Sequence, residues 1–273
     1  MSVMSTALPS RLRSRRGVNP DVAVLAVASV TQFMVVLDVT IINVALPQMR
    51  AALHMSTAGQ QWVVNAYALT FAGFLMLGGR AADLFGRKRV FLLGLAGFTL
   101  FSFLGGLAQS FVELIAARAA QGIGGAVLAP ASLSLLTARF TKPHERRRAL
   151  GVWSATAASG APGGLIAGGL LTDLIGWRWV LFVNVPVGIA VFVVALRSLA
   201  ESTGQPERRG LDVAGALTVT AGMAALIYGI VGTDSHPWGS PRTLSTIGAG
   251  LLILALFVAI EGTRSATVTD ALC

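Results

Sequence analysis

Long apolar segments, separated by short polar and charged stretches, run through almost the whole chain. A helix that crosses a bilayer needs about 20 mostly apolar residues. Eight segments meet this requirement, with these expected bounds: Val22–Leu46, Gln60–Leu77, Val90–Ala108, Val112–Ala138, Leu150–Thr172, Val180–Leu199, Val213–Val231 and Leu244–Ile260. The pattern therefore predicts an all-α integral membrane protein that crosses the bilayer eight times.

Two of the stretches between these segments repeat one another. Gly78–Phe91 reads GGRAADLFGRKRVF, and Gly168–Phe182 reads GGLLTDLIGWRWVLF. Each copy lies between the second and third segment of a set of three, so an odd number of crossings places the copies on opposite faces of the membrane. Pairs of three-helix units with opposite orientation are typical of secondary transporters. We predict a six-helix bundle of two inverted three-helix repeats, followed by two further membrane helices.

The polar stretches suggest a division of the chain into five parts. In chain order, we expect a basic cytoplasmic tail at 1–20, the six-span transporter bundle at 21–199, a cytoplasmic linker at 200–212, two linking membrane helices at 213–260 and a cytoplasmic tail at 261–273. Seventeen of the 21 Lys and Arg residues then fall on one side of the membrane. Because basic residues concentrate in cytoplasmic loops, both termini are predicted to be cytoplasmic in a multi-pass plasma membrane protein.

Composition supports this class and argues against others. Hydrophobic residues make up 54% of the chain and charged residues 12%, about half the charge of an ordinary soluble domain. The net charge of +9 comes from clusters between apolar runs, so it favours membrane topology over nucleic-acid binding. The single cysteine, Cys273, allows neither a disulfide nor a thiolate metal site. There is no Walker A, HExxH or CxxC pattern, so we expect no enzyme activity, cofactor or metal.

Two charged residues lie well inside the predicted crossings, Asp38 in the first and Arg118 in the fourth. A charge at mid-membrane costs roughly 2.5–3.5 kcal/mol on insertion scales, so each needs a reason to be there. At 1.5 Å per residue, Asp38 lies ~13 Å and Arg118 ~9 Å from the outer end of its helix. These depths are compatible with a mutual ion pair or with a shared aqueous cavity. A structural salt bridge and a titratable proton or cation site at Asp38 both remain open.

Small residues line one face of two predicted helices. In the fourth, Arg118 shares a face with Gly122, Gly125 and Ala129. In the fifth, glycines recur at four-residue spacing beside a proline, and the set is Gly160, Pro162, Gly164, Gly168 and Gly169. Such glycines let a neighbouring helix cross closely. Close packing is the simpler interpretation, and a moving contact between two halves of a transporter is the other.

The first repeated stretch carries both a turn and charges. Gly86 suits a turn with positive φ, and Asp83 has Arg80 and Arg87 as local ion-pair partners at three and four residues. A basic loop that fixes topology is one interpretation of this stretch. A gate is the other, in which Asp83 bonds to the N-terminus of a helix in a partner half.

Five motifs together resemble a known family. They are LDVTIINVALP at Leu37–Pro47, the stretch Gly78–Phe91, the arginine and glycines of Arg118–Pro130, the glycine helix Ala155–Thr172, and GWRW with NVPVG at Gly176–Gly188. In this order and spacing they resemble the fourteen-span drug/proton antiporters of the major facilitator superfamily, over about residues 20–262. One local departure is that Leu165 follows Gly164, with the proline placed earlier, at Pro162.

The resemblance implies roles for these residues. Asp38 would take part in proton coupling or in contact with a cationic substrate, and Arg118 in proton transfer or its control. The cytoplasmic gate would consist of Gly78, Asp83, Gly86, Arg87 and Arg89. The glycines of the fifth span would keep the exchange from leaking. The implied partners are the lipid bilayer, protons and a small lipophilic or cationic drug or antibiotic.

The resemblance also implies fourteen spans, whereas this sequence stops after eight. We therefore expect a truncated exporter that is inactive alone and would need a C-terminal half. A half-size transporter that works as a homodimer and a non-transporting membrane interaction module are the alternatives.

Overall fold

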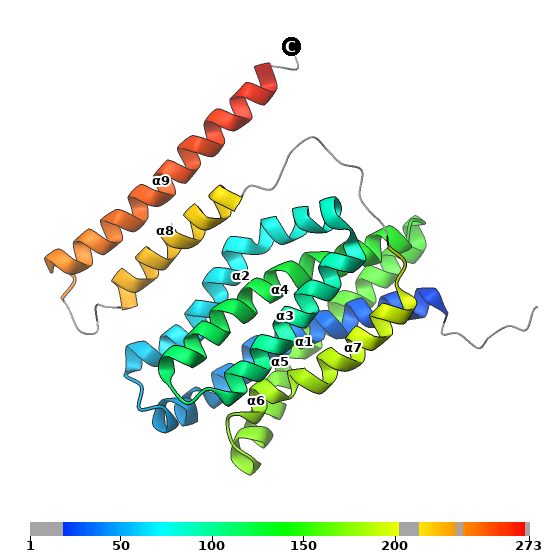
Figure 1. The fold of residues 1–273 in the computed structure, drawn as a ribbon, viewed down its shortest axis with the longest axis horizontal. Coiled ribbons are helices and arrows are strands. Elements are labelled where there is room, and N and C mark those ends of the chain that lie inside the picture. Colours follow the sequence, from blue (N-terminus) through cyan, green and yellow to red (C-terminus); the bar gives the residue numbers. More distant parts are fainter. Residues whose placement is uncertain (1–18, 202–212, 232, 234–236, 271–273) are drawn as a thin grey trace, which may run out of the picture.

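The structure of the chain is a computed structural model that describes residues 19–201, 213–231, 233 and 237–270. The part it describes is built from helices without strands (Figure 1). In chain order the helices are α1 (Pro20–Ala52), α2 (Thr57–Phe85), α3 (Arg87–Leu107), α4 (Phe111–Arg139), α5 (Pro143–Leu174), α6 (Trp179–Phe182), α7 (Asn184–Ser198), α8 (Val213–Val231) and α9 (Pro241–Asp270). The predicted all-α fold is confirmed. The expected tail at 1–20 and linker at 200–212 lie almost wholly outside the described residues, and α9 extends into the expected tail at 261–273.

Six helical stretches in the described residues are long and apolar enough to cross a membrane. They are Pro20–Ala52, Thr57–Phe85, Arg87–Leu107, Phe111–Arg139, Trp179–Ser198 and Pro241–Val258. The other two predicted crossings are also helical. The helix α5 has 32 residues, but its many Gly, Ala and Ser residues make it less apolar than its neighbours, and α8 contributes a shorter apolar helix at Leu217–Val231.

The sixth predicted crossing consists of two helices rather than one. The short helix α6 ends at Phe182, and α7 begins at Asn184. Pro186 explains the break, because its ring clashes with the carbonyl group four residues earlier, at Phe182, and it has no N–H to donate. The break places Asn184 at the first position of α7, inside the bundle.

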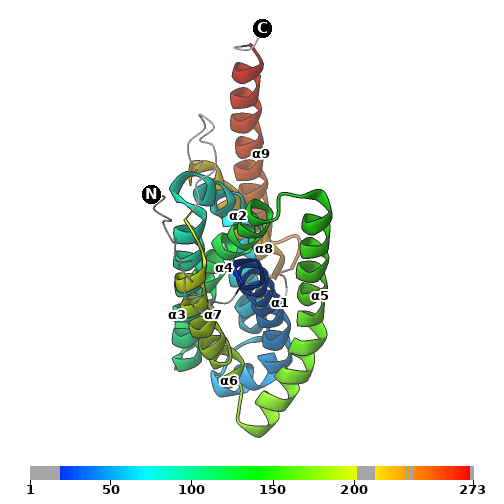
Figure 2. The same ribbon diagram turned by 90° about the vertical axis from the view of Figure 1, so that its right-hand side faces the viewer.

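The helices α1 to α7 form one bundle, and α8 and α9 form a separate pair beside it (Figure 1). Within the bundle, α2 packs on α4, α1 on α5 and α3 on both α4 and α7. Figure 2 shows α5 on one side of α1, with α3 and α7 together on the other side. The pair is held against α2, where Gly73 leaves room for Thr220 and the rings of Trp62 and Tyr228 lie 6.2 Å apart.

Equivalent glycines of the two repeats make equivalent contacts. A Cβ on Gly78 of α2 would clash with the backbone of Ala126 in α4. A Cβ on its counterpart Gly168 of α5 would lie 3.2 Å from the carbonyl oxygen of Ile41 in α1. The turn glycines also match, with φ of 101° at Gly86 and 102° at Gly176. The second helix of each repeat thus crosses the first helix of the other repeat, as two inverted repeats require.

A pair of basic residues extends the repeat to the helix ends. After the first turn glycine, Lys88 Nζ donates to the carbonyl oxygens of Leu196 and Leu199, at the end of α7, over 2.9 and 2.7 Å. After the second, Arg178 Nη2 donates to the carbonyl oxygen of Ala108, at the end of α3, over 2.8 Å. The last carbonyl groups of a helix lack partners and carry partial negative charge, so a cation there is stabilising. Each repeat thus caps the last helix of the other.

The stretch Gly78–Phe91, which was expected to lie between two crossings, is almost entirely helical, and this corrects its interpretation as a loop. The helix α2 continues to Phe85, α3 begins at Arg87, and Gly86 is the one residue between them. One residue is enough to reverse the chain here because Gly86 has a positive φ, a conformation that glycine adopts at little cost. None of the residues between Gly78 and Gly86 is a proline, the residue that would break the helix, so α2 continues to Phe85.

Candidate functional site

Asp38 and Arg118 meet in the middle of the bundle. Asp38 lies halfway along α1 with no exposed surface, and Arg118 lies near the start of α4 with 1% exposed. Arg118 Nη1 donates to Asp38 Oδ2 over 2.7 Å. Of the two arrangements that the sequence left open, the direct ion pair is the one present. Such a pair is stable in an apolar interior only when further hydrogen bonds satisfy both groups.

Two amides supply those bonds. Gln121 Nε2 donates to Asp38 Oδ1 over 2.9 Å, and Asn184 Nδ2 donates to the same oxygen over 2.7 Å. With Arg118, these groups give the carboxylate three donors. Gln121 also accepts a 2.6 Å bond from Arg118 Nη1. Side chains of α4 and α7 therefore hold the carboxylate in place.

Ser102 of α3 closes the network. Its hydroxyl accepts bonds from Gln121 Nε2 at 3.2 Å and from Asn184 Nδ2 at 3.0 Å. It donates to the carbonyl oxygen of Leu181, in α6, over 2.9 Å. All of these side chains are buried. A change of charge at Asp38 would therefore reach α3, α4, α6 and α7 through hydrogen bonds.

The helix α2 holds the guanidinium group from the other side. The ring of Tyr67 lies 4.3 Å from Arg118 Cζ, and Arg118 Nε donates to the carbonyl oxygen of Val63 over 3.4 Å. This close approach depends on Gly122, because a Cβ there would lie 2.5 Å from the carbonyl oxygen of Tyr67. The small-residue face of α4 thus admits the backbone of α2 beside Arg118 at this position.

Sequence reasoning missed three members of the site, Gln121, Ser102 and Asn184. Gln121 follows Arg118 by three residues, which places it on the same helical face. Asn184 lies inside the NVPVG motif as a polar residue near an apolar run. These two could have been found from spacing and polarity. Ser102 is a single hydroxyl in an apolar helix, which is too common to carry a signal.

The glycine helix packs against α1 along the segment that carries Asp38. A Cβ on Gly160 would lie 3.0 Å from the carbonyl oxygen of Phe33, and one on Gly164 would lie 2.9 Å from that of Leu37 and would also clash with Thr40. Gly168 continues the row, whereas Gly169 faces open space. Pro162 also lies inside α5, on its exposed side. The glycines thus bring α5 within contact distance of the turns on either side of Asp38.

Four of the residues predicted to form a gate, Asp83, Gly86, Arg87 and Arg89, lie around the α2–α3 turn. The fifth, Gly78, lies earlier in α2, against α4. Asp83 pairs with Arg87 over 3.5 Å, as one of its two expected local partners. Arg89 pairs with Glu201 over 3.5 Å, and the backbone N–H of Lys88 donates to Glu201 over 3.1 Å. Glu201, which follows α7, was not anticipated. Its carboxylate lies at the N-terminus of α3, where the helix dipole favours an anion.

The sequence profile of the Major Facilitator Superfamily matches residues 28–259, which includes the bundle and the α8–α9 pair. The chain belongs to the Major Facilitator Superfamily. This is a family of transporters and not of enzymes. Together with the apolar helices, this membership makes it a multi-pass protein of the plasma membrane.

Relatives within the superfamily are drug and antibiotic exporters or resistance proteins. The chain is 47% identical over 244 residues to the cephamycin export protein CmcT of Amycolatopsis lactamdurans, covering 89% of this chain and 50% of that protein. It is 44% identical to the puromycin resistance protein pur8 of Streptomyces alboniger, covering 87% and 47%. The chain thus spans about half the length of the curated relatives it matches.

Solved structures of superfamily transporters share the fold. The in meso crystal structure of the POT family transporter PepTSo matches with a TM-score of 0.64 at 14% identity, over 88% of this chain and 52% of that one. A bacterial homolog of the human lysosomal transporter Spinster, in an inward-facing and unoccupied conformation, matches with a TM-score of 0.56 at 22% identity, over 93% and 64%. The helix arrangement is therefore that of the superfamily.

The hydroxyl of Tyr67 allows a specific prediction at this site. Among the described residues, Tyr67 Oη is buried without a hydrogen-bond partner, which costs about 1–3 kcal/mol. Tyr67→Phe is expected to keep the stacking on Arg118 and to match or exceed the wild type in thermal stability, whereas Tyr67→Leu should lose about 1–2 kcal/mol. Thermal unfolding in detergent measures both.

Tyr228→Phe is the control, because the Tyr228 hydroxyl accepts a 2.7 Å bond from Arg242. A larger loss from Tyr67→Phe than from Tyr228→Phe would contradict the finding that the Tyr67 hydroxyl has no hydrogen-bond partner.

Proposed function

We propose that this chain is the proton-coupling unit of an exporter of small lipophilic or cationic drugs or antibiotics. The named functions of its relatives support export. Basic residues concentrate on one side of the predicted topology, which supports cytoplasmic termini. Alternating access requires two units that rock about a central site. In this proposal the second unit is a separate C-terminal half or a second copy of the chain.

The observation that carries the proposal is the buried carboxylate of Asp38, which is held by three donors. Proton uptake by Asp38 would neutralise the partner of Arg118 and leave a buried cation, and such a state is costly. A conformation that hydrates Arg118 or gives it another anion would then be favoured. Protonation at this site would thereby shift the balance between two arrangements of the bundle, which is the physical requirement for coupling.

The other predicted residues take roles around this pair. The close contacts of Gly160, Gly164 and Gly168 on α1 would keep water from reaching Asp38 along α5, consistent with the expectation that they prevent a leak. The gate would consist of Asp83, Gly86, Arg87 and Arg89 at the α2–α3 turn, together with Gly78 at the contact of α2 with α4. Of these, Asp83 is 42% exposed as a side chain, so it is accessible to a partner unit.

Ethidium efflux tests the proposal, in cells that lack their own exporters and in which membrane insertion of the chain is confirmed. The chain is expressed alone and together with the half of the cephamycin export protein CmcT that it does not match. We expect efflux that a protonophore abolishes, in at least one of the two conditions. Efflux by the chain alone would identify a second copy as the partner unit, and efflux only after co-expression would identify a C-terminal half.

Asp38→Asn is expected to abolish this efflux while the protein still inserts, because an amide cannot load and release a proton. Asp21→Asn is the matched control, since Asp21 is also on α1 but its side chain is 52% exposed and pairs with Arg139 at the helix end. Efflux at the wild-type rate in Asp38→Asn would rule out the coupling role. No efflux in either condition, despite good insertion, would favour a non-transporting interaction module.

A further inference from the structure

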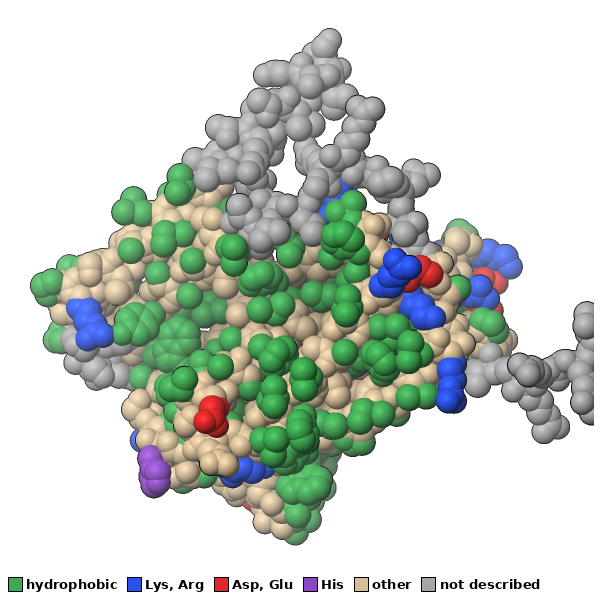
Figure 3. Space-filling view, viewed as in Figure 1, with side chains coloured by type: hydrophobic (Ala, Val, Ile, Leu, Met, Phe, Trp, Pro, Cys, Tyr) green, Lys and Arg blue, Asp and Glu red, His purple; other side chains and the backbone are tan. Residues whose placement is uncertain are grey.

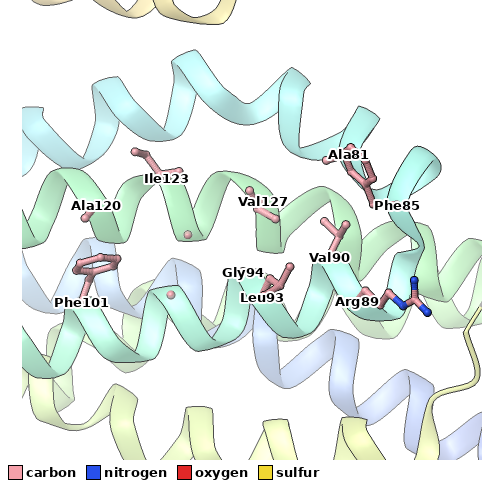
Figure 4. Close-up of a pocket in the computed structure, with 12 residues that line it drawn as sticks. Ala81, Phe85, Arg89, Val90, Leu93, Gly94, Phe101, Ala120, Ile123 and Val127 are labelled. Carbon is pink, nitrogen blue, oxygen red and sulfur yellow. The ribbon is translucent and has the colours of Figure 1, made fainter. Parts of the chain in front are cut away.

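A long apolar groove runs along the outside of the bundle between α2, α3 and α4. Its volume is about 710 Å³, and the residues that line it are Ala81, Phe85, Arg89, Val90, Leu93, Gly94, Gly97, Phe101, Ala120, Ile123, Gly124 and Val127 (Figure 4). Among these, Leu93 is 72% and Phe85 57% exposed. The groove is separate from the ion pair, none of whose residues lines it. It therefore opens outward, to the medium around the protein.

Missing side chains hollow the groove out. Gly97 lies between Leu93 and Phe101 on α3, and a Cβ built on it would meet nothing within 4 Å. On the floor, Gly94 and Gly124 bring α3 and α4 together, since a Cβ on Gly124 would lie 2.7 Å from the amide nitrogen of Phe98. The close packing of α3 on α4 forms the floor, and the open space at Gly97 leaves an elongated apolar groove parallel to the helices.

The length of the groove fits one leaflet of a bilayer. Arg89 and Phe101 lie at its two ends on α3 (Figure 4), separated by twelve residues or ~18 Å of helix. One leaflet contributes about 15 Å of hydrocarbon. The bundle spans a membrane, so a groove on its outer surface faces lipid. An apolar groove of this length is suited to a lipid acyl chain.

One end of the groove is basic. The Arg89 side chain is 77% exposed there and interacts with Glu201 over a long 3.5 Å contact. Arg87 and Lys88 adjoin it in sequence. Figure 3 shows several Lys and Arg side chains, with acidic side chains among them, at the end of the molecule where α2 meets α3, beside a surface that carries many hydrophobic side chains. A basic cluster at a membrane surface attracts anionic lipid headgroups.

We propose that this groove binds an anionic phospholipid of the leaflet on the α2–α3 side. One acyl chain lies between α3 and α4, past Gly97 as far as Phe101, and the phosphate group binds at Arg89. This site is independent of transport activity, because it concerns the outer surface of the bundle and not the Asp38 network. In this proposal Arg89, at the start of α3, binds the lipid phosphate in addition to its contact with Glu201.

Lipid binding by the purified chain tests the proposal. Native mass spectrometry in detergent compares titrations with dioleoyl-phosphatidylglycerol and dioleoyl-phosphatidylcholine. We expect phosphatidylglycerol to bind about fivefold tighter, the gain from one basic residue at an anionic headgroup. Gly97→Leu should weaken both lipids by about tenfold, because the new side chain takes the place of the acyl chain. Arg89→Gln should weaken phosphatidylglycerol more than phosphatidylcholine, in which the choline group offsets the phosphate charge, and should thereby remove the preference.

Matched controls change the same residue types elsewhere. Gly151→Leu also places a side chain in open space, but on α5, and Arg146→Gln removes an exposed basic residue from the start of α5. Both should bind lipid as the wild type does. If Gly97→Leu fails to fold, Ala120→Leu fills the groove from α4, and Gly97→Ala should retain most of the binding.

Three results would overturn the proposal. They are undiminished binding in both groove-filling variants, an equal loss in Gly151→Leu, and no preference of the wild type for phosphatidylglycerol. A photo-reactive benzoyl-phenylalanine at Leu93 adds a direct test in cells. An adduct of phospholipid mass is expected, whereas an adduct to another polypeptide would show that the groove is a protein interface.

Discussion

Asp38→Ala is expected to lower the free energy of unfolding by about 3–5 kcal/mol, because it leaves a buried arginine without its counter-ion. Arg118 is 1% exposed, so water cannot replace the lost carboxylate without a change in packing. The Nδ2 group of Asn184 and the Nε2 group of Gln121 would each also lose the acceptor that Asp38 Oδ1 provides. The reverse variant, Arg118→Ala, should cost a similar amount because it leaves the buried carboxylate of Asp38 without its counter-ion.

Replacing both members of the pair separates the cost of an orphaned charge from the value of the pair. The double variant Asp38→Leu/Arg118→Met removes both charges and keeps most of the volume. Exchange of a buried ion pair for apolar residues is often neutral or stabilising. We therefore expect the double variant to be more stable than either single alanine variant, although Asn184 and Gln121 still lose an acceptor.

The chain contains a matched control for this cycle. Asp21 and Arg139 also join α1 to α4, over 2.5 Å, but their side chains are 52% and 46% exposed. Exposed pairs contribute about 0–1 kcal/mol, so Asp21→Ala and Arg139→Ala should change stability little. Thermal unfolding of the purified variants in detergent measures the stability changes for both pairs. If Asp38→Ala costs no more than Asp21→Ala, the pair is hydrated and the coupling proposal loses its physical basis.

The inverted repeat made most of the bundle predictable. Gly78 and Gly168, or Gly86 and Gly176, hold equivalent places in two copies of one pattern, and glycine is the residue that close crossings and positive φ require. Sequence identity at these positions therefore reports geometry directly. Helix ends were less predictable. The continuation of α2 to Phe85 and the break before α7 depend on where a chain can bend, and polarity alone does not show this.

The core of the site was predictable because a charge in an apolar run is rare and costly. Asp38 and Arg118 stood out for that reason. Ser102 did not, because placing one hydroxyl among apolar residues costs little and is common. The contacts of Lys88 and Glu201 with distant segments could not be derived at all. They depend on how the end of α7 meets the start of α3, which is a consequence of the folded bundle.

Gly164→Ala is expected to destabilise the protein by about 1–3 kcal/mol, although alanine is normally the better helix former. The added Cβ would clash with the side chain of Thr40 and lie 2.9 Å from the carbonyl oxygen of Leu37. Both neighbours belong to the turn of α1 next to Asp38, so α5 would have to move away from that turn. Thermal unfolding of the variant in detergent measures the cost.

Gly169→Ala, five residues further along the same helix, provides the opposite expectation. Nothing lies within 4 Å of a Cβ at Gly169, so the variant should gain about 0.5–1 kcal/mol, the advantage of alanine over glycine in a helix. The two variants introduce the same methyl group into α5, and they differ in whether α1 is in contact. Opposite signs would show that α1 and α5 cross at the distance described here. Equal stability would mean that the two helices are already apart in the membrane, and α5 could not then shield Asp38 from water.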